Sequence, residues 1–127
     1  MIILKVTKEF GRGLYASTSV LKGIRVMLCE LLVLSKADTI NVNKTDLKHY
    51  TFKFNNECDC LVLGVGEIFN HSDHPNVAYN LVRVNGRTCM IFNALRHVRQ
   101  GEQLFIDYDA DIQVNTNSYV NSKSMIG

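Results

Sequence analysis

The sequence predicts a single, mainly β domain built from short strands. β-prone residues are common along its 127 residues, and only one proline interrupts them. Tyr50, Phe52 and Phe54 alternate with polar residues, which is the period-2 pattern of a half-buried strand. An Asn85-Gly86 pair separates two β-prone runs, which is the strongest short-range signal for a tight hairpin. A chain of this length buries roughly two-thirds of its unfolded surface and can form a real core.

In the first half of the chain we expect two strands around a turn-rich segment. Residues 2–7 predict the first strand, and residues 8–13 predict a turn after it. The nearly unbroken apolar run at 24–35 indicates either one long buried strand or two strands with a bend between them. The polar residues 36–48 predict a loop with room for one helical turn.

The second half is expected to contain the hairpin and three further strands. The alternating segment 50–55 and the apolar segment 60–63 each predict a strand. The hairpin is expected over 82–91, and a last strand over 103–108. From residue 113 onward Asn, Ser and Thr dominate, so we expect a tail that is loosely ordered on its own.

Composition excludes several classes of protein. Hydrophobic residues make up 46% and charged residues 20%, which is typical of a globular domain and not of a disordered chain. A net charge of +2 is too small to indicate direct nucleic-acid binding. No apolar run approaches the roughly 20 residues of a membrane helix, and no secretory signal is expected. The cysteines are too few for a disulfide framework and predict reduced thiols in an intracellular protein: Cys29, Cys58, Cys60 and Cys89.

Two glycines, Gly11 and Gly13, flank Arg12 directly after the first predicted strand. Such glycines let the backbone turn tightly or approach a ligand closely. The segment lacks the third glycine and the following helix of a dinucleotide-binding loop. A simple β-turn explains it as well.

Residues 64–76 contain two glycines, an Asn70-His71-Ser72 triplet and a Pro-Asn pair. Short polar groups beside glycines can bind a polar ligand, although an Asx-capped surface turn has the same composition. Cys58-x-Cys60 and His71-x-x-His74 do not show the paired spacing of a zinc site, so no metal is expected. Tyr108 ends the last strand among acidic residues, where its hydroxyl could lie at the edge of the domain.

Taken in order, these segments resemble the SET domain of protein lysine methyltransferases. The matches are Gly11-x-Gly13-Leu14-Tyr15-Ala16, then Leu21-Lys22-Gly23, Phe69-Asn70-His71-Ser72 with Pro75-Asn76, and Gly101-Glu102 leading to Asp107-Tyr108. They assign residues 1–110 to the domain and leave 111–127 as a polar C-terminal tail. The short length and residues 63–72 are most similar to the small free-standing SET proteins of large DNA viruses.

The resemblance implies a fold of several small β-sheets with a knot-like core and short helical turns. It also implies S-adenosyl-L-methionine as the cofactor. In the family the glycine loop, here 11–13, contacts the methionine part of this cofactor. Asn70 and His71 would lie along the cofactor. The segment before Tyr108 would thread past them, an arrangement that is rare among folds.

The chemistry agrees with these implied roles. Methyl transfer to nitrogen needs a neutral amine, whereas a free lysine has a pKa near ~10.4. A narrow apolar channel favours the neutral form by desolvation. Tyr108 is expected to orient the amine or to stabilise the sulfonium centre. Tyr50 is a candidate wall of the lysine channel, and a structural role in a core strand explains it equally well.

The chain departs from the family after its last strand. Many members complete the lysine channel there with a cysteine-rich zinc segment, and this chain has no cysteine after Cys89. Residues 111–127, with Tyr119, or a partner subunit would have to close the channel instead, so a homodimer is a hypothesis. Ile106 stands where members often carry Phe or Tyr, a position associated with the number of methyl groups added.

The prediction is therefore a protein-lysine N-methyltransferase that uses S-adenosyl-L-methionine, with Tyr108 and Tyr50 as catalytic candidates. Its substrate is expected to be an exposed lysine of another protein, with a histone tail as the example by analogy. We expect no nucleic-acid or membrane partner and do not choose between nucleus and cytoplasm. The alternative is a catalytically silent SET-fold module that binds peptide or cofactor.

Overall fold

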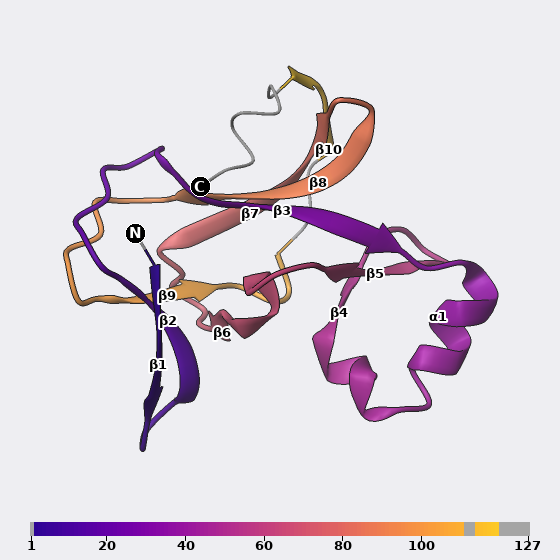
Figure 1. Cartoon of the computed structure of the whole chain (residues 1–127), viewed down its shortest axis with the longest axis horizontal. Coiled ribbons are helices and arrows are strands. Elements are labelled where there is room, and N and C mark those ends of the chain that lie inside the picture. Colours follow the sequence, from indigo (N-terminus) through magenta and orange to yellow (C-terminus); the bar gives the residue numbers. More distant parts are fainter. Residues whose placement is uncertain (1, 111–113, 120–127) are drawn as a thin grey trace.

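The computed structural model describes residues 2–110 and 114–119 and is mostly β (Figure 1). Its strands form a four-stranded sheet in the order β1-β2-β9-β6 and a six-stranded sheet in the order β10-β7-β8-β3-β5-β4. Short helical segments lie beside β4 and β5 (Figure 1). The prediction of a mainly β fold with several small sheets and short helical turns is confirmed.

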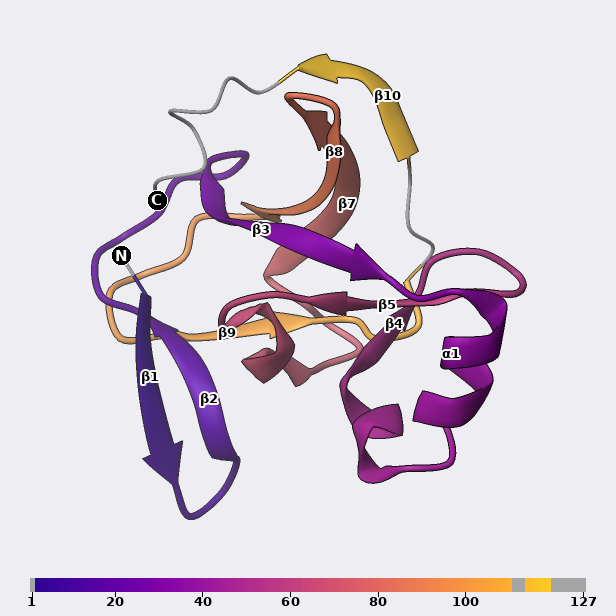
Figure 2. The ribbon, with the colours of Figure 1, turned by 45° about the vertical axis from the view of Figure 1, so that its right-hand side comes forward.

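The four-stranded sheet begins with β1 (Ile2–Thr7), which pairs antiparallel with β2 (Gly11–Ala16). The turn between β1 and β2 is shorter than the predicted turn at 8–13, because Gly11 already belongs to β2 and pairs with Thr7 of β1. The prediction of a loop over the two glycines is therefore wrong. β9 (Gln103–Ile106) is inserted between β2 and the two-residue strand β6 (Asn70–His71), because it pairs with both. Figure 2 shows β9 passing beside β2. This insertion is the counterpart of the expected threading.

The six-stranded sheet contains the predicted hairpin. β7 (Val77–Val84) and β8 (Arg87–Ala94) are joined by Asn85 and Gly86, which both have positive φ angles of 49° and 80°. Positive φ at both central residues is the requirement of a type I′ turn, and Asn-Gly meets it. β3 (Arg25–Val33) is one long strand beside β8. Of the two alternatives for the apolar run at 24–35, the single long strand is therefore the one observed.

The segment after β3 is more helical than expected. Ser35 caps α1 (Lys36–Val42) by accepting the Asp38 N–H, and Thr45 caps the 3-10 helix η1 (Asp46–Tyr50) in the same way. Tyr50 therefore ends a helix, and the predicted strand starts one residue later as β4 (Thr51–Lys53). β5 (Asp59–Val62) and the 3-10 helix η2 (Gly66–Ile68) follow.

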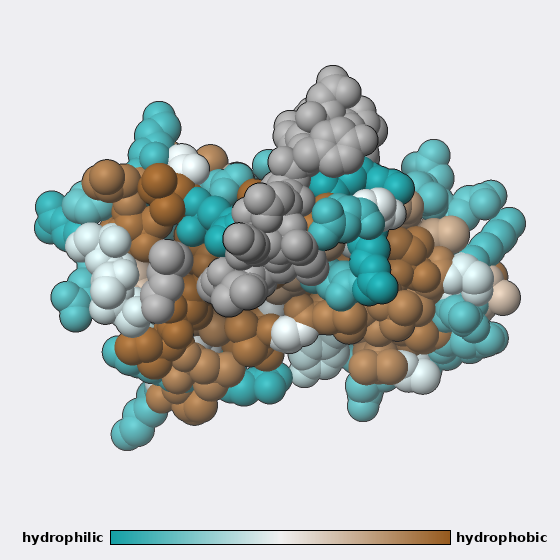
Figure 3. All heavy atoms as spheres, turned by 45° about the horizontal axis from the view of Figure 1, so that its top comes forward, coloured by the Kyte–Doolittle hydropathy of each residue, from teal (hydrophilic) through white to brown (hydrophobic). Residues whose placement is uncertain are grey.

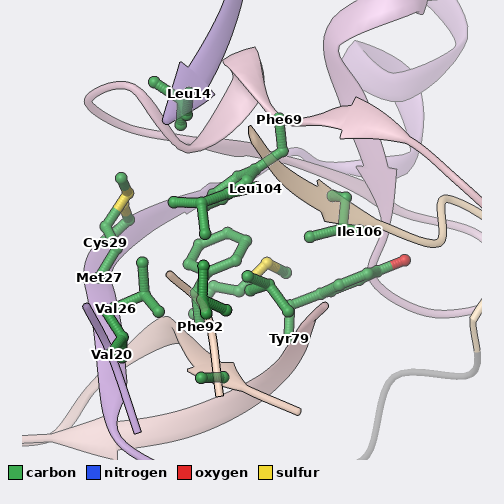
Figure 4. Close-up of a cluster of buried hydrophobic side chains, with 14 of the residues drawn as sticks. Leu14, Val20, Val26, Met27, Cys29, Phe69, Tyr79, Phe92, Leu104 and Ile106 are labelled. Carbon is green, nitrogen blue, oxygen red and sulfur yellow. The ribbon is translucent and has the colours of Figure 1, made fainter. Parts of the chain in front are cut away.

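The core contains residues from both sheets, including residues of β2 and β9 and the residue before β6 (Figure 4). Phe69, which precedes β6, stacks on Phe92 of β8 with ring centroids 4.6 Å apart. Leu104 and Ile106 of β9 and Leu14 of β2 have no exposed surface. Burying such side chains stabilises the fold by about 1.5–3 kcal/mol each, so β2, β6 and β9 are held firmly together.

The C-terminal segment expected to be loosely ordered contains β10 (Val114–Tyr119), which pairs parallel with β7 at the edge of the six-stranded sheet. The predicted tail of 111–127 otherwise falls outside the described residues. Within the described part, no helix is long and apolar enough to cross a membrane. Apolar and polar residues are mixed on the face seen in Figure 3. Among residues 2–110, Val6 and Leu21 are the most exposed large apolar residues.

Candidate active site

The site is built where β9 passes β6. In this parallel pair Asn70 lies opposite Phe105, and His71 lies opposite Ile106. The Ser72 N–H continues the pairing by donating to the Ile106 carbonyl at 3.0 Å. Tyr108 follows β9 by two residues and so reaches the Asn-His-Ser block despite the distance in sequence. The structure thus brings the three residues Asn70, His71 and Tyr108 together, as expected.

Asn76 fixes the position of β9. This side chain is only 2% exposed, and its Nδ2 donates to the Gln103 carbonyl at 2.8 Å. Its Oδ1 accepts the Phe105 N–H, also at 2.8 Å. Both ends of the amide are therefore bonded to the main chain of β9, which a residue at a surface turn would not do. Asn76 holds the strand that carries Tyr108 to the site.

Asn70 links the glycine segment to β9. Its Nδ2 donates to the Arg12 carbonyl and to Gln103 Oε1, both at 2.8 Å. A Cβ added at Gly13 would lie 2.5 Å from Gln103 Oε1 and 3.0 Å from Asn70 Nδ2. A larger residue at position 13 would therefore force the Gln103 amide to move, because the two amide side chains pack directly against the Gly13 α-carbon.

Tyr108 is held by two hydrogen bonds. Its hydroxyl donates to the Phe69 carbonyl, and its N–H donates to His71 Nδ1 at 2.9 Å. Because the His71 Nδ1 accepts, its Nε2 carries the proton and donates to Asp73 Oδ1 at 3.1 Å. The Tyr108 hydroxyl proton is thus committed to Phe69, while its oxygen lone pairs remain available as acceptors.

The same contacts argue against a metal at this place. His71, Asp107 and Asp109 each have one potential ligand atom, and these atoms lie within 4.8 Å of one another. However, both ring nitrogens of His71 are already engaged, by the Tyr108 N–H and by Asp73. A metal ion would have to displace a hydrogen bond that positions Tyr108.

Two cavities meet at Tyr108. The smaller has a volume of about 290 Å³ and the larger about 530 Å³. Arg12, Tyr50 and Asn70 line the smaller cavity only. The larger cavity has aromatic walls from Phe52, Phe54 and Tyr79. Three side chains line both cavities: His49, Glu67 and Tyr108.

Tyr50 lies with the residues expected to bind the cofactor. Arg12 Nη2 donates to the Tyr50 hydroxyl at 3.3 Å, so both side chains border the smaller cavity. Tyr79 is a wall residue of the larger cavity instead. Its buried hydroxyl donates to the Asp107 carbonyl at 2.8 Å, next to Tyr108 in the chain.

Glu67 is the charged residue at the centre of this arrangement. Burial raises its pKa to about 7, and the Val62 N–H, which donates to Glu67 Oε1 at 2.7 Å, partly offsets the rise. The pKa of Tyr108 is raised as well, first by burial and then by the nearby charge of Glu67. The negative charge of Glu67 therefore acts on the hydroxyl of Tyr108 within the wall that the two cavities share.

Cys29 and Cys60 are buried and unreactive. Burial raises the pKa of Cys29 to about 11 and that of Cys60 to about 12, so both remain thiols at neutral pH. The structure pairs none of the four cysteines in a disulfide. The three buried cysteines, Cys29, Cys60 and Cys89, pack as small apolar residues.

Sequence reasoning missed several residues of the site. Glu67 could have been noticed as a lone charge in the apolar segment 61–69. Tyr79 stands three residues after Asn76 on β7, a strand that the sequence pattern predicts only from Val82 onward. Gln103 and His49 carry no local signal, because only the tertiary fold brings them to the site.

A SET domain profile matches residues 11–109, and the chain accordingly belongs to the SET-domain family. A related Schizosaccharomyces pombe protein, a histone-lysine N-methyltransferase specific for H3 lysine-37, is 28% identical over 106 residues, which are 83% of this chain and 71% of that protein. A histone-lysine N-methyltransferase specific for H3 lysine-4 from Cryptococcus neoformans is 28% identical over 112 residues, 77% of this chain and 7% of that protein.

Solved structures share the fold. A Plasmodium falciparum candidate histone methyltransferase superposes with a TM-score of 0.70 at 20% identity, over 87% of this chain and 99% of that chain. The polycomb repressive complex 2 from Chaetomium thermophilum, in an autoinhibited conformation bound to S-adenosylmethionine, gives 0.71 at 20% identity, over 85% of this chain and 15% of that one. At this identity the likeness shows the fold alone.

Proposed function

We propose that this protein transfers a methyl group from S-adenosylmethionine to the side-chain amine of a lysine in another protein. The observation that carries the proposal is the pair of cavities that share one wall, formed by His49, Glu67 and Tyr108. A group-transfer enzyme with two substrates needs such a junction, because the reacting atoms must meet while the rest of each molecule binds separately.

The smaller cavity suits the cofactor. Arg12 offers a guanidinium for a carboxylate, and Asn70 offers an amide in the same cavity. The phenol of Tyr50 and the exposed ring of Phe10 supply aromatic surface for a nucleoside. This donor set matches an amino-acid head joined to a nucleoside, so Arg12, Tyr50, Asn70 and Tyr108 would hold the group. When bound, the cofactor supplies a methyl group made electrophilic by its sulfonium sulfur.

The larger cavity suits a lysine side chain. Phe52, Phe54 and Tyr79 form walls that pack against methylene groups and exclude water. Tyr108 lines this cavity as well, and its oxygen can accept a hydrogen bond from the amine, because its own proton points to Phe69. Removal of water disfavours the charged amine and helps to produce the nucleophile.

Closure of the larger cavity belongs to the same proposal. Ala110 lines this cavity and leads directly into the tail of 111–127. We assign the outer wall of the channel to this tail or to a second copy of the chain in a homodimer. Sedimentation of the active protein tests the dimer, since full activity in a monomer would exclude it.

A histone H3 tail is the substrate class that we propose first. The two related methyltransferases are both specific for lysines of H3. This substrate would place the enzyme with chromatin in the nucleus, which for a SET protein of the proposed viral kind is the nucleus of the host cell.

The direct test is transfer of a radiolabelled methyl group from S-adenosylmethionine to recombinant histone H3, with mass spectrometry of the product. We expect label on a lysine of H3 and none on H3 in which all lysines are replaced by arginine. Turnover on another lysine-containing protein in preference to H3 would retain the reaction and reject the histone. Absence of label on H3 and on a whole-cell protein mixture would contradict the proposed function.

A further inference from the structure

Glu67 lies where the two cavities meet but has no part in binding either substrate as described above. Its Oε1 accepts the Val62 N–H, and in the described part of the chain its Oε2 has no hydrogen-bond partner. The side chain projects from the short helix η2, whose first residue Gly66 is packed against Val62 and Cys29. One carboxylate oxygen is thus anchored by the main chain, while the other is free at the junction.

The reaction in the preceding subsection needs a proton acceptor. A lysine arrives as an ammonium ion at neutral pH, and its nitrogen has no lone pair until one proton leaves. Tyr108 does not accept this proton, because its hydroxyl is protonated and already donates to Phe69. Desolvation lowers the pKa of the amine but does not by itself say where the proton goes.

On the basis of the proposed function, we propose that the carboxylate of Glu67 accepts this proton and acts as the general base of the reaction. Glu67 is a carboxylic acid that lines both the substrate cavity and the cofactor cavity, as Tyr108 does. Its pKa of about 7 supports the assignment, since a base works best when its pKa is near the operating pH.

The step balances without a further reactant. One N–H bond of the lysine ammonium breaks and one O–H bond forms on Glu67 Oε2, which leaves a neutral amine and a neutral carboxylic acid. The amine lone pair then forms the N–C bond while the C–S bond breaks and its electron pair stays on sulfur. The proton on Glu67 leaves to water through the cavities, and the product is a methylammonium ion.

Several other titratable groups face the same junction and must be separated from Glu67. His49 of η1 lines both cavities, and Lys48 and Lys53 line the larger one. Arg12 of β2 borders the smaller cavity. The buried thiols and phenols on β3, β5 and β7 stay neutral through the relevant pH range, since their pKa values are raised: Cys29, Cys60 and Tyr79. His49 is therefore the main rival.

The first measurement is a titration of the Glu67 carboxyl by carbon-13 NMR of the full-length protein without ligands, with the signal assigned by its loss in Glu67→Gln. We expect a midpoint near 7. A Glu67 midpoint near 4.5 would overturn the proposal.

The second measurement is the pH–rate profile on histone H3 for the wild type, Glu67→Gln and His49→Gln. The glutamine at 67 keeps the acceptor for the Val62 N–H, so the fold is preserved. We expect about a 10²-fold lower kcat for Glu67→Gln at pH 8 and loss of the inflection near pH 7. The kcat of this variant should recover as the pH approaches the pKa of the free lysine amine. His49→Gln should keep the inflection.

The outcomes separate the two proposals. A Glu67→Gln enzyme with the wild-type profile, or an inflection that disappears in His49→Gln, would refute Glu67 as the base while methyl transfer stands. A wild type without turnover would refute the proposed function, and the NMR midpoint would still report on Glu67. Binding of S-adenosylhomocysteine should be equal in the wild type and Glu67→Gln, which excludes a general loss of the site.

Discussion

The hydroxyl of Tyr108 donates a hydrogen bond to the main-chain carbonyl of Phe69, 39 positions earlier in the chain. Phe69 is fully packed in the core against Phe92, so its carbonyl is a rigid acceptor. The N–H of Tyr108 is bound to His71, two residues after Phe69. Tyr108 is therefore held by one short segment both at its main chain and at its hydroxyl.

Replacement of Tyr108 by phenylalanine should abolish most turnover. The variant keeps the ring and the N–H bond to His71 but removes the oxygen at the junction of the cavities. We expect kcat to fall by about 10²-fold or more, as for other single polar groups at a reacting centre. Tyr15→Phe is the control, because Tyr15 lies under Lys5 on the β1–β2 hairpin. Unchanged turnover in Tyr108→Phe would remove this tyrosine from the reaction.

Gly13→Ala should destabilise the protein through a clash with Gln103. The added Cβ would lie 2.5 Å from Gln103 Oε1, so the amide must move and its hydrogen bond with Asn70 must weaken. We expect a loss of about 1–3 kcal/mol in the free energy of unfolding, measured by urea. Combining it with Gln103→Ala should cost less than the sum of the two single changes. Additive effects would show that Gly13 and Gln103 are independent.

Asn76→Ala should cost more stability than an ordinary surface change. It removes the donor and the acceptor that hold the main chain of β9, and it leaves the Gln103 carbonyl and the Phe105 N–H unpaired. The expected loss is about 2–4 kcal/mol, from two unsatisfied buried groups. Asn80→Ala on β7 is the matched control and should change stability by less than about 0.5 kcal/mol. A loss as small as that of the control would contradict the role of Asn76.

Stability should depend on pH through Glu67. Its pKa of about 7 in the folded protein lies above the ordinary 4.5, so the folded state holds a proton that the unfolded chain releases between these values. This contribution is fully present below about pH 4.5 and is lost as the pH rises through 7. Glu67→Gln should therefore be more stable than the wild type at pH 8, by on the order of 2 kcal/mol, and similar at pH 4.5. Urea unfolding of the wild type and Glu67→Gln at both pH values checks this prediction. Equal stability of the two proteins at pH 8 would contradict it.

The elements predicted well are those whose signal is local. Asn85-Gly86 specifies its turn because both residues tolerate positive φ, and the apolar run at 24–35 forms one long strand because β8 and β5 cover it. The glycine segment was expected as a turn, since its pairing with β1 and β9 is not local. Tyr50 was assigned to a strand from its alternation, which the cap at Thr45 overrides by starting a helix.

The candidate site divides in the same way. Asn70, His71 and Tyr108 could be named because the family motifs contain them, and the structure brings them together. Glu67, Gln103 and Tyr79 depend on contacts between segments far apart in the chain, such as Gln103 with Asn70 and Tyr79 with Asp107. A pattern along the sequence does not contain those contacts.

The central claim is that the smaller cavity binds the cofactor, and calorimetric titration of S-adenosylhomocysteine tests it most directly. We predict saturable one-to-one binding to the wild type. We also predict affinity at least about tenfold weaker in Asn70→Ala, which removes the amide joining Arg12 and Gln103, and unchanged affinity in Asn80→Ala. The absence of binding at millimolar ligand, or equal affinity in Asn70→Ala, would contradict the assignment of this cavity.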